Sequence, residues 1–222
     1  MTKRLRKRKT GKDPKSTQDK ILSAAMKVFA EHNFRDATTR MICTEAHVNV
    51  ALVNYYFRSK AELYKAVVST LFENVAKPML SIPDAVCDEA TWKKAMYTWV
   101  RRSLAICAAQ KPPEYYIARL IGMEETEPSE LTQDIESKFT EPMRQRFRRL
   151  LRMAMPDADE DTVSLWASSI NAQSVVYVLA KSGWLSKYCA LTPEFDRERW
   201  LDRVADHICE GVFCRLSFQR CV

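Results

Sequence analysis

The chain has 222 residues, a formal net charge of +7, 46% hydrophobic residues and only four glycines. This composition excludes a disordered chain, and so few glycines disfavour barrels, sandwiches and Gly-rich phosphate loops, which need many tight turns. We therefore expect an all-α protein of long helices joined by short loops.

The positive charge is concentrated at the N-terminus. Residues 1–12 contain seven lysines and arginines and no acid, so residues 13–222 are neutral overall. Such a block cannot bury itself and suits a polyanion, either nucleic acid or an anionic membrane surface. We predict a disordered basic arm at 1–14, in which Arg4, Arg6 and Arg8 contact the DNA backbone or minor groove. An adventitious soluble tail is the alternative.

The remaining composition points away from metal, cofactor and membrane chemistry. Seven cysteines without a CxxC pair and three dispersed histidines indicate reduced thiols, no metal site and no cofactor. No apolar run reaches the ~18 residues of a membrane span. The sequence contains no HExxH motif, no Glu-x-x-His pair and no nucleophile elbow. We expect a cytoplasmic protein that is not an enzyme and does not enter a membrane.

A one-faced helix is predicted over about residues 15–32. Ser16 or Thr17 can cap its start, and Asn33 can end it, because asparagine tolerates the left-handed conformation. Its apolar stripe consists of Ile21, Leu22, Ala25, Val28 and Phe29.

Two short helices follow, separated only by His47 and Val48. Thr38 is the predicted N-cap of the first, which runs to about Ala46, and Asn49 caps the second, which runs to about Tyr55. Helices this short with so brief a connection must cross steeply, which is the helix-turn-helix geometry.

The later helices are predicted between proline-, aspartate- and glycine-containing loops. Ser59 and Glu62 form a capping box for a helix that runs to about Leu80. Further helices are expected at about 89–109, 114–125, 129–153, 159–184 and 195–217. Five arginines crowd the end of segment 129–153, as a solvated face or a second nucleic-acid site: Arg144, Arg146, Arg148, Arg149 and Arg152.

The stretch from Ile21 to Leu63 resembles the N-terminal domain of the TetR family of regulators. The resemblance lies in Ile21-Leu22, Ala24-Ala25, Val28-Phe29, Phe34, Thr38, Ile42, Ala46, Val48, Tyr56-Phe57, Ser59-Lys60 and Leu63. The phrase VNVALVNYYFRSK is most similar to the CecR subgroup. The resemblance implies a DNA-binding domain at 15–63 and a helical ligand-binding and dimerisation domain at 64–222.

The sequence departs from the family pattern at four positions. His47 replaces a glycine in the turn, where a positive φ is expected at a cost of ~1 kcal/mol. Cys43 replaces an alanine, and Asn33 replaces a glycine. Asn54 replaces a tyrosine that contacts phosphate in the family, which leaves open whether Tyr55 or Tyr56 makes that contact.

The second short helix has the composition of a recognition helix. We expect Val53 to face the core with Ile42 and Phe57, and one of the two tyrosines to be buried as well. Outward apolar groups suit thymine methyls, and polar side chains and Lys60 suit phosphates. The predicted DNA-binding residues of this domain are Thr38, Thr39, Arg40, Asn49, Val50, Ala51, Leu52, Asn54, Tyr55, Tyr56 and Lys60.

The larger domain is expected to hold a ligand pocket and a dimer interface. Aromatic side chains with a few polar groups are typical of a ligand site, although such stripes are also typical of a core. The candidate pocket residues are Trp92, Met96, Trp99, Arg119, Met123, Glu124, Trp166 and Gln173. The last two helices are predicted to pair with their copies through Val163, Ile170, Val175, Leu179, Trp200, Val204, Ile208 and Val212.

Together these features predict a homodimeric regulator bound to a palindromic operator in double-stranded DNA. The resemblance implies a repressor that a small-molecule effector releases by shifting the fourth helix. A ligand-responsive activator, and a non-specific binder of nucleic acid or an anionic surface through the arm, are the alternatives.

Overall fold

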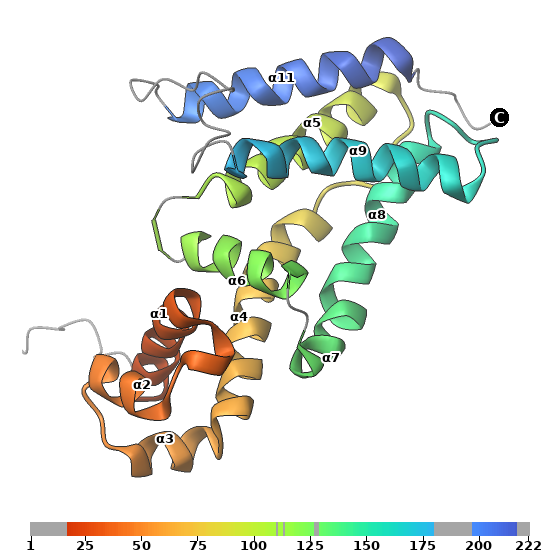
Figure 1. Cartoon of the computed structure of the whole chain (residues 1–222). Coiled ribbons are helices and arrows are strands. Elements are labelled where there is room, and N and C mark those ends of the chain that lie inside the picture. Colours follow the sequence, from red (N-terminus) through yellow and green to blue (C-terminus); the bar gives the residue numbers. More distant parts are fainter. Residues whose placement is uncertain (1–16, 110, 113, 127–128, 180–196, 217–222) are drawn as a thin grey trace, which may run out of the picture. The chain divides into compact units, whose positions relative to one another are not determined.

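The computed structural model describes residues 17–109, 111–112, 114–126, 129–179 and 197–216, and every element within these ranges is helical (Figure 1). The prediction of an all-α protein is confirmed. The chain divides into two compact units, Met1–Leu63 and Tyr64–Val222. The boundary falls inside one helix, α4 (Lys60–Leu80). Each unit is described by itself.

The N-terminal unit consists of α1 (Thr17–Asp36), α2 (Thr39–Ala46), α3 (Val50–Phe57) and the first turn of α4. Helix α2 packs against both α1 and α3. Ile42, Val53 and Phe57 are buried, as their spacing predicts. Helix α1 extends beyond the predicted end because the chain resumes a helical turn after Asn33, whose φ of 56° makes a kink.

Side-chain caps fix where these helices begin. The Oγ1 of Thr38 accepts a hydrogen bond of 3.2 Å from the backbone N–H of Met41. The Oδ1 of Asn49 accepts one of 2.9 Å from the N–H of Leu52. Each cap satisfies an N–H that has no partner within its own helix, so the cap residues set both helix starts. These predicted caps are confirmed.

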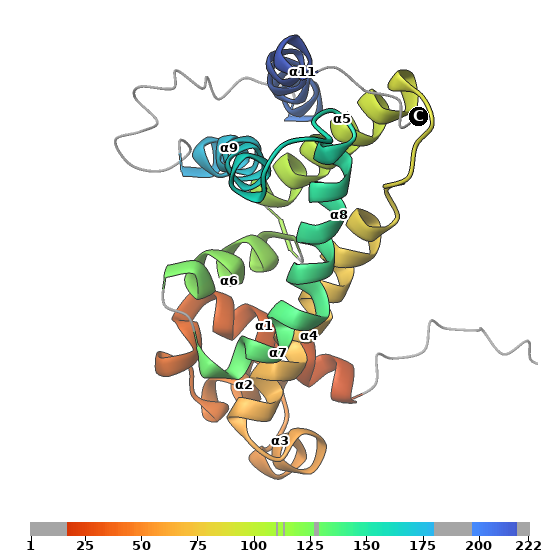
Figure 2. The ribbon, with the colours of Figure 1, turned by 90° about the vertical axis from the view of Figure 1, so that its right-hand side faces the viewer.

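The C-terminal unit is built around α5 (Glu89–Cys107). Helices α6 (Glu114–Thr126), α8 (Glu141–Arg152), α9 (Glu160–Leu179) and α11 (Arg197–Arg215) all contact it. Figures 1 and 2 show α9 and α11 running along α5. Trp92 and Met96 are fully buried in the core that α5 organises. Residues 180–184, 195–196 and 217, which the predicted last helices included, lie outside the described residues.

The prediction of one continuous helix over 129–153 is wrong. This segment contains a 3₁₀ turn, η1 (Glu130–Thr132), a short α7 (Gln133–Ile135), a π-helical turn, η2 (Glu136–Thr140), and then α8. Pro142 lies in the first turn of α8. Because proline has no N–H, it cannot bond to the carbonyl four residues earlier, which interrupts a regular helix at this point.

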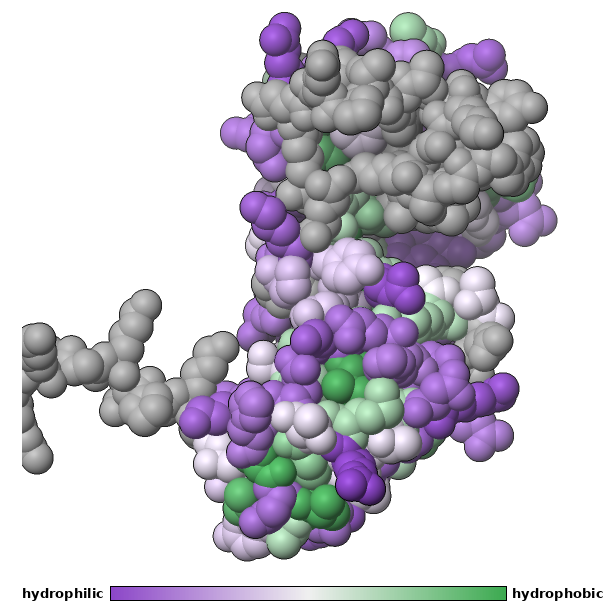
Figure 3. All heavy atoms as spheres, turned by 60° about the vertical axis from the view of Figure 1, so that its left-hand side comes forward, coloured by the Kyte–Doolittle hydropathy of each residue, from purple (hydrophilic) through white to green (hydrophobic). Residues whose placement is uncertain are grey.

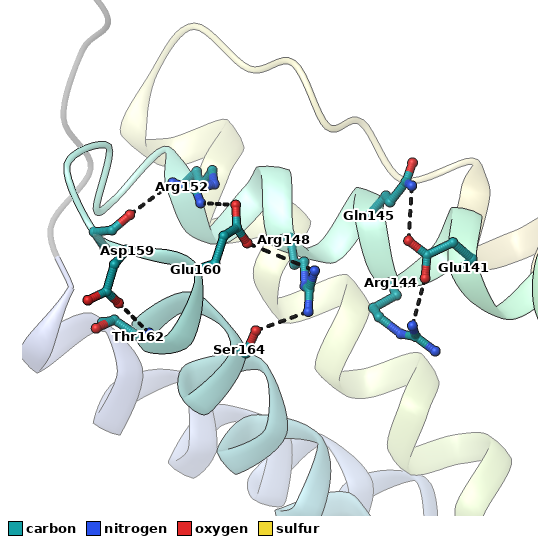
Figure 4. A network of polar contacts seen from close by, with 10 residues as sticks. Glu141, Arg144, Gln145, Arg148, Arg152, Asp159, Glu160, Thr162 and Ser164 are labelled. Atoms are coloured by element: carbon teal, nitrogen blue, oxygen red, sulfur yellow. Dashed lines mark hydrogen bonds and ion pairs between the residues drawn. The ribbon is translucent and has the colours of Figure 1, made fainter.

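The arginines of α8 hold the C-terminal unit together. Arg148 donates to the Oγ of Ser164 at 3.0 Å, and Arg152 contacts Glu160, both at the start of α9 (Figure 4). Arg149 forms a 2.6 Å ion pair with Asp84. These contacts bind α8 to α9 and to the loop before α5, so the arginine cluster stabilises the packing within the C-terminal unit.

Candidate DNA-binding surface

Helix α3 presents an uncharged face to solvent. Val53 and Phe57 lie four residues apart and are buried, so the opposite side of the helix is exposed. The exposed residues Val50, Ala51, Asn54 and Tyr55 form what we call the reading face, which extends from that side to Val50 at the start of the helix; 45% of Val50 is exposed. Figure 3 shows hydrophobic residues at the surface of the N-terminal unit where α3 lies. This surface can enter a groove and offer methyl, amide and hydroxyl groups to base edges.

Neither tyrosine of α3 is a core residue, so the prediction that one of them is buried is wrong. Tyr55 is 79% exposed and Tyr56 is 37% exposed. Their rings meet edge to face, with centroids 5.1 Å apart. With Val53 and Phe57 filling the inward positions, the three residues between them must point sideways or outward. Both phenols are therefore available to a phosphate.

The predicted contacts at the start of α2 lie at the surface, and Leu52 of α3 is half-buried. Thr38 and Arg40 are exposed, and Thr39 is half-buried. Asn49 is also exposed. In the cap bonds Thr38 Oγ1 and Asn49 Oδ1 act as acceptors, so the threonine hydroxyl proton and the asparagine amide NH₂ can still donate to a phosphate.

Lys60 does not fit its predicted role as a phosphate ligand. Its Nζ donates to the carbonyl oxygens of Phe34 and Ala37, each at 2.9 Å, and to that of Arg35 at 3.5 Å. The ammonium also lies 4.5 Å from the centroid of the Phe34 ring. All three ammonium protons are therefore directed at the end of α1, and the residue joins α4 to α1 inside the unit.

The turn between α2 and α3 has the conformation that sequence predicts. His47 adopts φ 54° and ψ 46°, the left-handed region expected where the family has glycine. Its N–H bonds to Thr44 O at 3.3 Å, and the N–H of Val48 bonds to Cys43 O at 3.0 Å, which closes the end of α2. A side chain in this region is strained by ~1 kcal/mol.

Sequence reasoning missed Arg58 as a candidate contact. It follows α3 directly, is exposed, and adopts φ 62° at the C-cap, with its N–H bonded to Asn54 O at 2.9 Å. The sequence did contain an indication of this turn, because Arg58 is the single residue between the end of α3 at Phe57 and Ser59, the cap of the next helix. Arg4, Arg6 and Arg8 lie outside the described residues.

The predicted pocket residues do not form one site. Trp92 is buried, with its Nε1 donating to Leu150 O at 2.8 Å. Trp99 stacks on Phe147 with ring centroids 4.7 Å apart, and Met96 is buried beside them on α5. Arg119 is exposed on α6, and Met123 is half-buried. Trp92, Met96 and Trp99 of α5 are therefore core residues, which was the alternative to a ligand pocket in the sequence analysis.

Glu124 is the acceptor of a hydrogen-bond cluster. Its carboxylate accepts from the Tyr64 hydroxyl at 2.5 Å, from Thr132 Oγ1 at 2.8 Å, and from both the N–H and the Oγ of Ser129. Burial, and then the hydrogen bond and charge of Glu124, raise the pKa of Tyr64. The cluster ties the first residue of the C-terminal unit to the end of α6 and to η1.

A surface hollow of about 410 Å³ lies between α9 and α11. It is lined by two predicted pocket residues, Trp166 and Gln173, and by three predicted interface residues, Ile170, Ile208 and Val212. The predicted ligand pocket and the predicted dimer interface therefore overlap at this hollow.

Most of the predicted interface side chains are already buried within one chain, so that prediction needs correction. Those at 9% exposure or less are Val163, Ile170, Val204, Ile208 and Val212. A side chain covered by its own chain has little area left to bury against a second copy. Trp200 is half-buried, and the side chains of Val175 and Leu179 lie outside the description. Leu165 of α9, by contrast, is 68% exposed.

Comparison with known proteins supports a two-part regulator. Residues 21–67 match the bacterial regulatory proteins of the TetR family, and residues 92–212 match the C-terminal domain of the HTH-type transcriptional dual regulator CecR. The second match alone covers more than half of the chain. The protein belongs to the TetR family of transcription regulators, with a CecR-type C-terminal domain.

Individual relatives are similar over shorter stretches. The chain is 31% identical over 81 residues to the probable regulator YttP of Bacillus subtilis, covering 36% of this chain and 39% of YttP. It is 31% identical over 100 residues to the repressor NicS of Pseudomonas putida, covering 43% and 47%. The chain thus spans less than half of these relatives. A Clostridium perfringens putative fatty acid metabolism regulator shares the fold, with TM-score 0.61, 21% identity, and coverage of 90% and 100%.

Proposed function

We propose that this protein is a homodimeric DNA-binding transcription repressor that a small-molecule effector releases from a palindromic operator. The observation that carries the proposal is the exposed, uncharged reading face of α3, held by capped helices in a TetR-type unit. A soluble tail or a membrane-surface module needs no such face. Among the described residues, no helix has the length and apolar content to cross a membrane.

Repression is favoured by the relative NicS, which is named a repressor. A second mode has its own support, because the matching C-terminal domain is named for a dual regulator. The second candidate function is therefore a regulator that also activates from the same operator.

The dimer is proposed to form through α9 and α11. Leu165 exposes a large apolar side chain on α9, and the half-buried Trp166 next to it lines the hollow between the two helices. A twofold dimer carries two copies of α3, and its symmetry matches that of a palindrome.

The effector is proposed to act through α4, which is continuous across the boundary between the two units. A ligand that binds one position of α4 more tightly than another shifts the population toward that position. The fold match to a protein named as a putative fatty acid metabolism regulator makes acyl compounds a first class to screen.

The test is selection of a randomised duplex pool by the full chain at near-physiological salt. A palindrome should be enriched, and Tyr55→Ala should weaken its binding, whereas Gln145→Ala, which truncates an exposed, uncharged side chain of α8, is the control. A salt-sensitive background without any enriched sequence would instead support a non-specific binder that uses the basic arm.

A further inference from the structure

The reading face contains neither of the two side chains that most often bind guanine, arginine and lysine. Arginine or lysine bonded to the guanine O6 and N7 atoms is the commonest base-specific contact in the major groove. Helix α3 (Val50–Phe57) contains no charged residue at all. Direct reading by this helix therefore has to use methyl contacts, the amide of Asn54 and the phenol of Tyr55.

Two nearby lysines of the unit are already engaged. Lys60 is directed at the carbonyls of Phe34 and Ala37, and Lys27 forms a 2.9 Å ion pair with Glu45 of α2. Arg40 on α2 and Arg58 after α3 are exposed and lie outside α3. Arg40 and Arg58 therefore lie beside the reading helix, where they suit phosphates or bases outside its own contacts, and α3 itself has no cation for a guanine.

The first turn of α3 presents aliphatic groups. In a helix-turn-helix protein, the N-terminal residues of the recognition helix contact the base edges. Here those residues are Val50 and Ala51, both exposed. In the major groove, only thymine offers a methyl group, and an asparagine amide pairs with the N6 and N7 atoms of adenine. Asn54 lies one turn further along the same exposed side.

From this geometry we infer that α3 reads A·T base pairs, with Val50 and Ala51 against thymine methyls and Asn54 on an adjacent adenine. The inference rests on the proposed function and deepens it by naming the bases of the half-site. G·C pairs that the protein requires should lie only where Arg40, Arg58 or the arm reaches.

The experiment uses the selected operator and removes one methyl at a time by replacing thymine with deoxyuridine. At a thymine that contacts Val50, the affinity of the full chain should fall about fourfold, the effect of exposing one methyl-sized group. At thymines outside the half-site centre, the replacement should change nothing. Because the deoxyuridine measurement uses the unaltered protein, its result does not depend on whether a variant folds.

Val50→Ala supplies the matching protein change. The side chain is 45% exposed, so its truncation should leave the helical circular dichroism intact and make binding insensitive to deoxyuridine at the contacted position. Gln145→Ala, which truncates an exposed, uncharged residue of α8, should keep the fourfold sensitivity.

The outcomes separate this inference from the proposed function. An enriched palindrome with invariant G·C pairs at the half-site centre and no deoxyuridine effect would overturn the A·T reading and leave a sequence-specific regulator standing. Absence of any enriched palindrome would overturn both. Central A·T pairs with a deoxyuridine effect that Val50→Ala abolishes would support the inference.

Discussion

Replacing Lys60 with methionine should loosen the N-terminal unit without removing a phosphate contact. The substitution keeps a long apolar stem beside Phe34 and deletes the ammonium that bonds to the carbonyls of Phe34 and Ala37. Hydrogen bonds from a charged donor contribute about 1.5–3 kcal/mol each, and a cation over an aromatic ring adds about 0.5–1 kcal/mol. Because Lys60 is only half-buried and water can replace part of this, we expect a loss of roughly 2–4 kcal/mol.

The measurement is hydrogen exchange of peptides from residues 17–63 in the full chain. A loss of this size should accelerate exchange of the most protected amides about 30-fold to 1,000-fold. Lys20→Met is the matched control, since Lys20 is exposed on α1 and the substitution removes the same charge. The control should leave exchange nearly unchanged.

The salt dependence of operator binding decides between the two roles of Lys60. A lost phosphate contact lowers the slope of log affinity against log salt by about 0.9, beyond any change seen for Lys20→Met. We expect no such additional change. Unaltered hydrogen exchange together with a salt slope reduced by that amount would refute the role of Lys60 in joining α4 to α1. It would instead support the predicted phosphate contact.

Three further substitutions test the remaining structural arguments. Tyr64→Phe removes the hydroxyl bonded to Glu124 and should cost about 1–3 kcal/mol in urea unfolding; an unchanged midpoint would contradict the cluster's role. Partial burial disfavours ionised Asp84, but the hydrogen bond from Arg149 and the charges of Arg146 and Arg149 outweigh it and lower the pKa of Asp84. The stabilisation that ionised Asp84 gives the fold is therefore present above the ordinary carboxyl pKa and lost as pH falls through the lowered pKa. Asp84→Asn should lower the free energy of unfolding at pH 7, and the difference from the parent protein should disappear in acid. His47→Gly relieves the strain of the left-handed conformation and should raise the free energy of opening of α2 by up to ~1 kcal/mol, which slows its amide hydrogen exchange. Faster hydrogen exchange in α2 would contradict this argument.

The N-terminal unit was predictable because its signals are local. The starts of α2, α3 and α4 each depend on a side chain that accepts a hydrogen bond from an N–H three positions later, as Asn49 does from Leu52. The orientation of α3 follows from Val53 and Phe57 alone. The error over the tyrosines has the same local origin: once these two positions fill the inward face, Tyr55 and Tyr56 have to lie outside it.

Long-range contacts were not predictable from one sequence. Nothing near Lys60 indicates that its ammonium meets carbonyls at the end of α1. Arg119 and Glu124 were both predicted as polar groups of the pocket, yet two residues that are five positions apart on a helix do not share a face. Glu124 instead accepts hydrogen bonds from Tyr64, Ser129 and Thr132, and Tyr64 lies 60 residues away in the sequence.

The apolar stripes of α9 and α11 show a different limit. An inward stripe looks the same whether it faces the chain's own core or a second copy. The decisive fact is that both helices pack on α5, which uses up Val163 and Val204 within one chain. Only the central position of α5, which no local pattern reveals, separates the two interpretations.

Charge and sequence reading are divided between separate parts of this protein. The net charge of the whole chain equals that of residues 1–12, while α3 carries none. Phosphate neutralisation is independent of sequence and depends steeply on salt, whereas methyl and amide contacts distinguish bases and depend little on salt. For the proposed regulator, the arm therefore sets how tightly any duplex is held, and α3 sets which duplex is preferred. Because α3 carries no charge, a substitution in this helix should change which duplex is preferred and leave the salt dependence of binding nearly unchanged.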